Sequence, residues 1–449
     1  MSLIGGHHVA NKLYLYWRKV AIDTTAFWTS IIVPLNPPWC SAKLCLTRAE
    51  PTALLDVDLE LQSPLDEASD SDPDYDYWAN DEAEAADSLA EKVEDALAFI
   101  VNHGGVPLAE KVEDALAFIV NHGGVPSRWR TLALITDVFL VQQTVMQFFG
   151  ESQFPSLTFL SMKFTGPYEH DYADNHALVS EVDFEPGLLF RESPTQLRSV
   201  KLQGVPASYL FGHSLHPQFV SLTDLELRFE IFYPMLADFN KLLAANPELE
   251  TISLTSKDTF GPVEIDGEHF PHICLPKLRS LSVILVAPHW ILRVIMMVDV
   301  PNITSLELRL GIVSREQNAD QVGIRGLFDY IVGDEIQGTP APRFPSLRSL
   351  TIASEMSQDF EDDLTAVLHA YPQLTELTLP SCLSLSPLLE QPWLVPGIEQ
   401  LRVGCDSLAQ LQEVVDLRRG AGLPLRTVLF NIYCCTSAIG WSARLTFDD

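Results

Sequence analysis

The stretch FPSLRSLTI, residues 344–352, decides the fold, because close variants of it recur along the chain. It has a proline near its start and three apolar residues, Leu347, Leu350 and Ile352, in the pattern apolar-x-x-apolar-x-apolar. Apolar residues that alternate along a short segment predict a β-strand with one face toward a core. The recurrence raises the question of how many such strands the chain contains and how they bury their apolar sides.

The apolar pattern occurs eleven times between residues 129 and 430. Eight of the ten intervals between successive starts are 24 to 29 residues long. This period is typical of leucine-rich repeats, in which one strand–helix repeat cannot bury its apolar face alone and stacked neighbours bury it jointly. The eleven patterns start at Trp129, Leu157, Leu197, Leu222, Leu249, Leu278, Ile303, Leu347, Leu374, Ile398 and Leu425.

Proline stands two residues before the first apolar position in seven of these repeats. Proline stops a helix and favours extended backbone in its neighbour, so it predicts the joint between a helix and the next strand. The two long intervals predict loop insertions near 165–193 and 311–343. The sequence therefore predicts an α/β fold, an irregular leucine-rich-repeat solenoid of about eleven strand–helix repeats over residues 127–449. The seven prolines are Pro155, Pro247, Pro276, Pro301, Pro345, Pro372 and Pro396.

Composition narrows the class of protein. The 449 residues carry a formal net charge of −31, which argues against binding nucleic acid through phosphate contacts. No apolar run reaches the roughly 18–20 residues that span a bilayer, and the N-terminus lacks the apolar core of a signal peptide. The seven scattered cysteines suit free thiols in a reducing compartment. We expect a soluble intracellular protein, cytoplasmic or nuclear, that binds neither nucleic acid nor membrane.

Two segments separate the N-terminal region, residues 1–60, from the repeats. Residues 61–88 are acidic and poor in aliphatic side chains, which predicts a flexible linker. Residues 89–107 and 108–126 are identical, LAEKVEDALAFIVNHGGVP, and each copy predicts a helix followed by a glycine cap. A two-copy helical repeat is one interpretation. We favour a recent duplication or a gene-model error, because structural repeats normally vary their surface residues.

The segment YWRKVAIDTTAFWTSI, residues 16–31, resembles the second half of an F-box domain. Such domains commonly end with a Trp-Arg pair, a Val-Ala pair, a Thr-rich turn and a Trp-Thr/Ser-x-Ile close. The following stretch, residues 42–61, is similar to the linker strand of fungal F-box proteins with leucine-rich repeats. The Leu-Pro opening of an F-box does not precede Asn11, so the resemblance predicts a small helical F-box truncated in its N-terminal half. The matching residues are Trp17, Arg18, Val20, Ala21, Trp28 and Ile31.

The resemblance implies a function and a partner. F-box proteins dock on the Skp-type adaptor of a cullin (SCF) E3 ubiquitin ligase, so this chain would be its substrate-recognition subunit in the ubiquitin conjugation pathway. The residues implied to contact the adaptor are Trp17, Val20, Ala21, Trp28 and Ile31. The alternative is a non-catalytic leucine-rich-repeat scaffold, or a decoy without ligase function.

Target binding is expected on the concave strand face of the repeats. Residues between the apolar positions point away from the core, and basic residues among them suit an acidic or phosphorylated partner. The other interpretation is that these charges pair with neighbouring glutamates and only keep the strands soluble. The candidate target-binding residues are Lys163, Lys201, Arg228, Arg309 and Arg402.

We find no catalytic constellation, metal site or cofactor motif, and we expect no enzyme activity. In GHSLH, residues 212–216, a histidine replaces the second glycine of a nucleophile elbow, so we interpret Ser214 as a surface serine. The spaced aspartates of residues 70–76 lack the glycine of a calcium loop. His269, His272 and Cys274 lack a fourth ligand for a structural metal ion.

Overall fold

The computed structural model divides the chain into two compact units, Met1–Gln196 and Leu197–Asp449. Each is described by itself. Among the described residues, no helix is long and apolar enough to cross a membrane. The structure describes residues 19–20, 24–62, 108–165, 188–205, 207–211, 218–229, 233–256, 270–310, 317–333, 335–336, 339–354, 361–380, 385–391, 393–405, 408–432 and 441–446.

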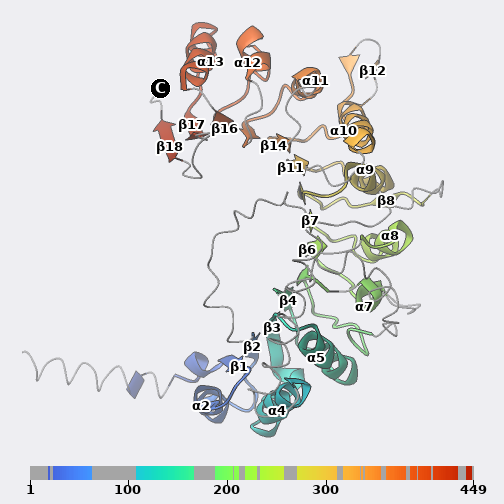
Figure 1. The fold of residues 1–449 in the computed structure, drawn as a ribbon, viewed down its shortest axis with the longest axis vertical. Coiled ribbons are helices and arrows are strands. Elements are labelled where there is room, and N and C mark those ends of the chain that lie inside the picture. The colour runs from blue at the N-terminus through green and yellow to red at the C-terminus, as the bar shows by residue number, and fades with distance from the viewer. Residues whose placement is uncertain are drawn as a thin grey trace, which may run out of the picture. The chain divides into compact units, whose positions relative to one another are not determined.

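The first unit contains four parallel strands that pair in chain order. The sheet joins strands from the N-terminal region to strands of the predicted repeats, and one apolar row runs through Ile31, Val57, Leu132 and Leu160 in register. Helices α2, α4 and α5 lie between the strands in sequence (Figure 1). The bounds are η1 Thr25–Trp28, β1 Ser30–Pro34, α2 Cys40–Arg48, β2 Leu55–Leu61, α4 Leu108–Asn121, η3 Pro126–Arg128, β3 Trp129–Thr136, α5 Phe139–Glu151 and β4 Phe159–Phe164.

The predicted helical character of the N-terminal region is only partly right. Ser30–Pro34 is a strand, not a helix, because Ile31 and Val33 alternate with exposed residues and both are buried against the helices. The predicted linker segment, residues 42–61, begins in α2 and becomes a strand at Leu55. Residues 63–107, which include most of the acidic linker and the first identical copy, lie outside the described residues.

The second identical copy forms the predicted helix, α4. Its apolar stripe places Val112, Leu116 and Ile119 in the core. Gly123 ends the helix with φ +91°, a conformation that glycine adopts without strain.

The second unit is built around an open, largely parallel sheet whose strands again follow chain order. The last strand, β18, is antiparallel to β17. The strands are β5 Ser199–Gln203, β6 Asp224–Phe229, β7 Thr251–Ser256, β9 Ser280–Ile284, β11 Ser305–Leu310, β14 Ser349–Ser354, β15 Glu376–Leu379, β16 Gln400–Cys405, β17 Thr427–Ile432 and β18 Trp441–Thr446.

The helices of the second unit connect successive strands and lie along one face of the sheet (Figure 1). The opposite face carries no helix among the described residues. Two short strand pairs, β8 Ile273–Cys274 with β10 Val298–Asp299 and β12 Glu335–Ile336 with β13 Thr339–Pro340, lie outside the main sheet. The helices are α7 Ala207–Phe211, α8 Leu236–Ala244, α9 Pro288–Met297, α10 Gln317–Val332, α11 Glu361–Ala370, α12 Ser386–Glu390 and α13 Leu408–Gly420.

All the apolar positions of the eleven predicted patterns are buried, with at most 8% of any side chain exposed. In the second unit the central position forms one continuous row across nine strands, since each member is the register partner of the next. The sequence pattern therefore predicted the core residues and their alignment. The row is Val200, Leu225, Ile252, Leu281, Leu306, Leu350, Leu377, Leu401 and Val428.

The seven recurring prolines each occupy the second position of a tight turn before a strand. In every case the amide of the first apolar residue donates to the carbonyl three residues earlier, as Leu347 does to Phe344 at 3.1 Å. Proline suits the second position because its φ is already that of a type I or II turn. The carbonyls belong to Phe154, Asn246, Leu275, Val300, Phe344, Tyr371 and Val395.

One predicted insertion is not a simple loop. Residues 311–343 contain α10 and the β12–β13 hairpin, because Ile324, Leu327, Phe328 and Ile331 form an apolar stripe that is buried. Most of the other predicted insertion, near 165–193, lies outside the described residues.

Candidate binding surface

The candidate surface is the strand face of the second unit that carries no helix among the described residues. Alternate residues of each strand point to this face, while the intervening ones enter the core. The central residues of this face are register partners across the nine strands. They are Lys201, Glu226, Ser253, Ser282, Glu307, Thr351, Thr378, Arg402 and Leu429.

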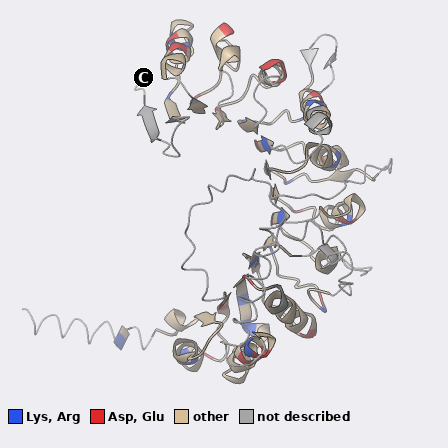
Figure 2. Cartoon of the chain, viewed as in Figure 1, with Lys and Arg blue, Asp and Glu red and all other residues tan. Residues whose placement is uncertain are grey.

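Four of the five candidate target-binding residues lie on this face. Figure 2 shows Lys and Arg in blue at several strands of the second unit. Lys201 and Arg402 belong to the central row, and Arg228 and Arg309 come two residues further along their strands. Lys201 on β5 and Arg402 on β16 are seven strand spacings apart, about 34 Å at roughly 4.8 Å each. The fifth candidate, Lys163, is exposed on β4 of the first unit. The structure therefore brings four candidates to one face without gathering them into one cluster.

Carboxylates pair with two of these cations. The Lys201 ammonium lies 2.9 Å from Glu226, and Arg309 Nε lies 2.7 Å from Glu307. Glu307 also accepts a hydrogen bond from the Ser282 hydroxyl at 2.6 Å. Exposed pairs of this kind contribute little to stability, but they reduce the local field of each cation. Lys201 and Arg309 are therefore already paired with carboxylates in the structure.

Sequence reasoning missed the hydroxyl groups at the centre of the face. Strands β7, β9, β11 and β14 carry serine or threonine at most outward positions, and these positions are in register. Short side chains leave the strand backbone accessible to a partner. The sequence does contain a signal for these hydroxyl groups. Ser or Thr recurs directly before the second apolar position of the pattern and between the second and third apolar positions. The residues are Thr251, Ser253, Thr255, Ser280, Ser282, Ser305, Ser349 and Thr351.

Buried polar side chains hold the turns that position these strands. Asn246 accepts a hydrogen bond from the amide of Leu222 at 2.8 Å and donates to the carbonyl of Phe219 at 3.1 Å. The Tyr371 hydroxyl donates to the carbonyl of Ile331 at 2.7 Å, and its burial raises its pKa well above the usual range. Both residues are fully buried. Asn246 ties the turn before β7 to the turn before β6, and Tyr371 ties the turn before β15 to the end of α10.

The candidate adaptor residues are placed differently from one another. Trp17 and Ala21 lie outside the described residues. Val20 and Trp28 are partly exposed, and the Arg48 guanidinium lies 4.7 Å from the centre of the Trp28 ring. Ile31 is fully buried on β1, so its side chain belongs to the core and not to a contact surface.

Two exposed hydrophobic side chains lie on η1 and α2, two elements that contact each other in the first unit. Phe27 on η1 is 64% exposed and Leu44 on α2 is 42% exposed. Both elements lie in the first unit. These two residues were not among the candidates, because exposed apolar side chains cannot be told from core ones by spacing alone.

Most residues of the catalytic and metal-binding motifs considered in the sequence lie outside the described residues. Residues 212–217, 257–269 and 63–107, which include Ser214, His269 and the aspartates of residues 70–76, are not described. Within the described part, no group of three or more His, Cys, Asp or Glu side chains could hold a metal ion.

No family model and no curated protein matches this sequence.

Proposed function

We propose that the second unit is a leucine-rich-repeat module and that the chain is the substrate-recognition subunit of a cullin-type (SCF) E3 ubiquitin ligase. The observation that carries the proposal is the unbroken register from Val200 on β5 to Val428 on β17. It supports a face made of alternate residues from nine neighbouring strands, which suits an extended protein target. Under this proposal the transfer of ubiquitin belongs to other subunits, and the chain raises the effective concentration of the target.

The adaptor would bind the first unit near Trp28. Phe27, Trp28 and Leu44 supply partly or largely exposed apolar surface on η1 and α2. Such surface, next to the cation of Arg48, is typical of the core of a protein interface.

A repeat scaffold or decoy without ligase function is the second candidate. The complete burial of Ile31 favours it, since one of the residues expected to contact the adaptor is unavailable for contact. In this case the face of the second unit would still bind a protein, but no adaptor would join the complex.

Co-purification with a Skp-type adaptor separates the two candidates. The full chain is mixed with purified adaptor and analysed by size-exclusion chromatography with light scattering. The ligase proposal predicts a complex that Phe27→Ser and Trp28→Ala weaken, whereas Trp393→Ala, at an exposed tryptophan of the second unit, leaves it intact. A chain that stays separate from the adaptor at micromolar concentrations supports the scaffold.

A further inference from the structure

A second row of side chains lies at the amino-terminal ends of the strands in the second unit. It consists of the second residue of each repeated pattern, and we name it the rim. Each rim amide donates to the carbonyl of the rim residue before it, over 2.7–2.9 Å, so the backbone is continuous from end to end. In strand order the rim is Arg198, Thr223, Glu250, Arg279, Thr304, Arg348, Thr375, Glu399 and Arg426.

Arginine and threonine follow one another three times along the rim. Each threonine hydroxyl donates back to the carbonyl of the arginine before it, as Thr304 does to Arg279 at 3.1 Å. The threonines are therefore engaged in holding the backbone. The arginine side chains, all exposed, are the groups that the rim presents to solvent.

Two of the arginines are held in place by the neighbouring turn. Nη1 of Arg198 donates to the carbonyl of Ser221, and Nη1 of Arg348 donates to the carbonyl of Gln373, both at 3.2 Å. These bonds run along the rim and orient the guanidinium groups. A pre-oriented arginine loses less entropy when it binds a carboxylate.

The middle of the rim, from Glu250 to Thr375, has two arginines and one glutamate and therefore a net positive charge. Arg426 is paired with Glu399 at 3.0 Å. Among the described residues, by contrast, no carboxylate pairs with Arg279 or Arg348. A local excess of arginine in a chain with a net charge of −31 is complementary to an acidic partner.

We propose that the rim binds an extended acidic segment of the target protein, with carboxylates on Arg198, Arg279 and Arg348. Three strand spacings separate the first two arginines and two separate the last two, about 14 Å and 10 Å. An extended peptide rises about 3.3 Å per residue and places alternate side chains on the same side, so acidic residues at positions 1, 5 and 9 face the rim together. They span about 26 Å, against about 24 Å between Arg198 and Arg348, and the long arginine and glutamate side chains absorb the difference. The segment therefore has the pattern acid-x-x-x-acid-x-x-x-acid, with each carboxylate able to accept two hydrogen bonds from a guanidinium. This inference rests on the proposed binding function and names the class of target.

The test uses the full chain and two fluorescein-labelled synthetic peptides of equal composition. One has glutamate at positions 1, 5 and 9 of an otherwise serine and alanine sequence, and the other has its three glutamates adjacent. We expect tighter binding of the spaced peptide by fluorescence anisotropy, weakened by added salt. Arg279→Gln and Arg348→Gln should each weaken binding about tenfold, because each removes a charge-assisted pair. Equal affinity for both peptides, or no measurable binding, would overturn the proposal.

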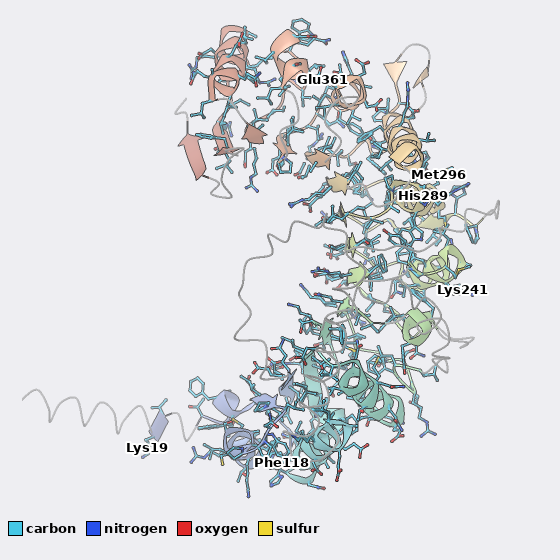
Figure 3. The ribbon with its side chains drawn as sticks, viewed as in Figure 1. Lys19, Phe118, Lys241, His289, Met296 and Glu361 are labelled. Carbon is cyan, nitrogen blue, oxygen red and sulfur yellow. The ribbon has the colours of Figure 1, made fainter. Side chains whose placement is uncertain are left out.

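Lys241→Gln provides the matched control. It removes one positive charge from α8 in the helix layer, where Lys241 pairs with Asp238 at 2.8 Å (Figure 3). The control should bind the spaced peptide like the unmodified chain, and thermal unfolding checks that every variant is folded. If Lys241→Gln weakens binding as much as Arg279→Gln does, the effect is one of net charge and the rim is excluded. The adaptor test involves only the first unit, so either proposal can fail without the other.

Discussion

Nη1 of Arg418 on α13 donates a hydrogen bond to the carbonyl of Leu394, 2.9 Å away, although the arginine side chain is fully buried. Nη2 donates to the next carbonyl, that of Val395, at 3.1 Å. Val395 has φ +49°, so the arginine holds a strained turn from inside the helix layer. Burial also lowers the pKa of the guanidinium.

Replacing Arg418 by methionine should lower the free energy of unfolding by about 3 kcal/mol, because two carbonyls lose their partner inside the core. Chemical denaturation monitored by circular dichroism measures the loss. Arg419→Met is the control on the same helix. Arg419 is exposed and pairs with Asp416, so its replacement should cost less than about 1 kcal/mol. Equal losses in both variants would contradict the structural role of Arg418.

Gly323 allows α10 to approach α9 closely. A Cβ atom on this residue would lie 3.1 Å from the His289 amide nitrogen and 3.2 Å from Pro288 Cβ. Gly323→Val should therefore separate the helices and destabilise the protein by about 1–3 kcal/mol. The same substitution at Gly420, where a Cβ atom would have no neighbour within 4 Å, should change stability by about 0.5 kcal/mol or less. Thermal unfolding of both variants checks the contrast, and similar midpoints would refute close packing at Gly323.

Asp58 introduces a pH dependence in the first unit. Desolvation, followed by the neighbouring charge of Glu60, raises the pKa of the Asp58 carboxyl. Because the pKa is higher in the folded state, this group's stabilising contribution is complete below the unfolded value of about 3.9 and is lost as pH rises through the folded value.

Asp58→Asn should therefore stabilise the protein at pH 7, and the gain should shrink toward pH 4. Urea unfolding at the two pH values measures the difference. Glu113→Gln, which also removes one carboxylate, is the control variant at an exposed position on α4. A gain for Asp58→Asn that is the same at both pH values would rule out ionisation of Asp58 as its cause.

Removing either identical copy yields the same chain, because residues 89–107 and 108–126 are the same sequence. The shortened chain still encodes α4 with its buried Val112, Leu116 and Ile119. If the duplication is incidental, the midpoint of thermal unfolding should stay within a few degrees of that of the full chain. A change of about 1 kcal/mol or less in the free energy of unfolding produces a shift of this size. A fall of ten degrees or more would show that both copies support the fold.

The sequence predicted the core of this protein well because the same apolar pattern recurs in every repeat. Leu350, Leu377 and Leu401 recur at a spacing that only neighbouring strands satisfy, and the prolines locate the turns before them. The strand at Ser30–Pro34 was missed because two alternating residues, Ile31 and Val33, are too few to establish a period. The helix α10 was missed because its stripe falls inside a long interval between two patterns.

The candidate surface was predicted less completely than the core. The spacing placed Lys201, Arg228, Arg309 and Arg402 on one face, but the pairing of Lys201 with Glu226 depends on which strands are neighbours. The buried Arg418 could not be foreseen, since a charged residue on a helix is usually exposed. Arg279 and Arg348 precede the alternating part of their strands, so the strand pattern alone assigned them no face.

The segment between β11 and β14 shows how the protein tolerates a change in length. It adds α10 and a hairpin, yet Leu306 and Leu350 on either side remain direct register partners. The turn at Phe344–Leu347 starts the next strand whatever the length of the segment before it. The inserted residues therefore add to the helix layer, and the spacing of the outward side chains stays the same. Loops and tags grafted at this position should therefore be accepted without altering what the opposite face recognises, which makes it a practical site for fluorophores or affinity handles.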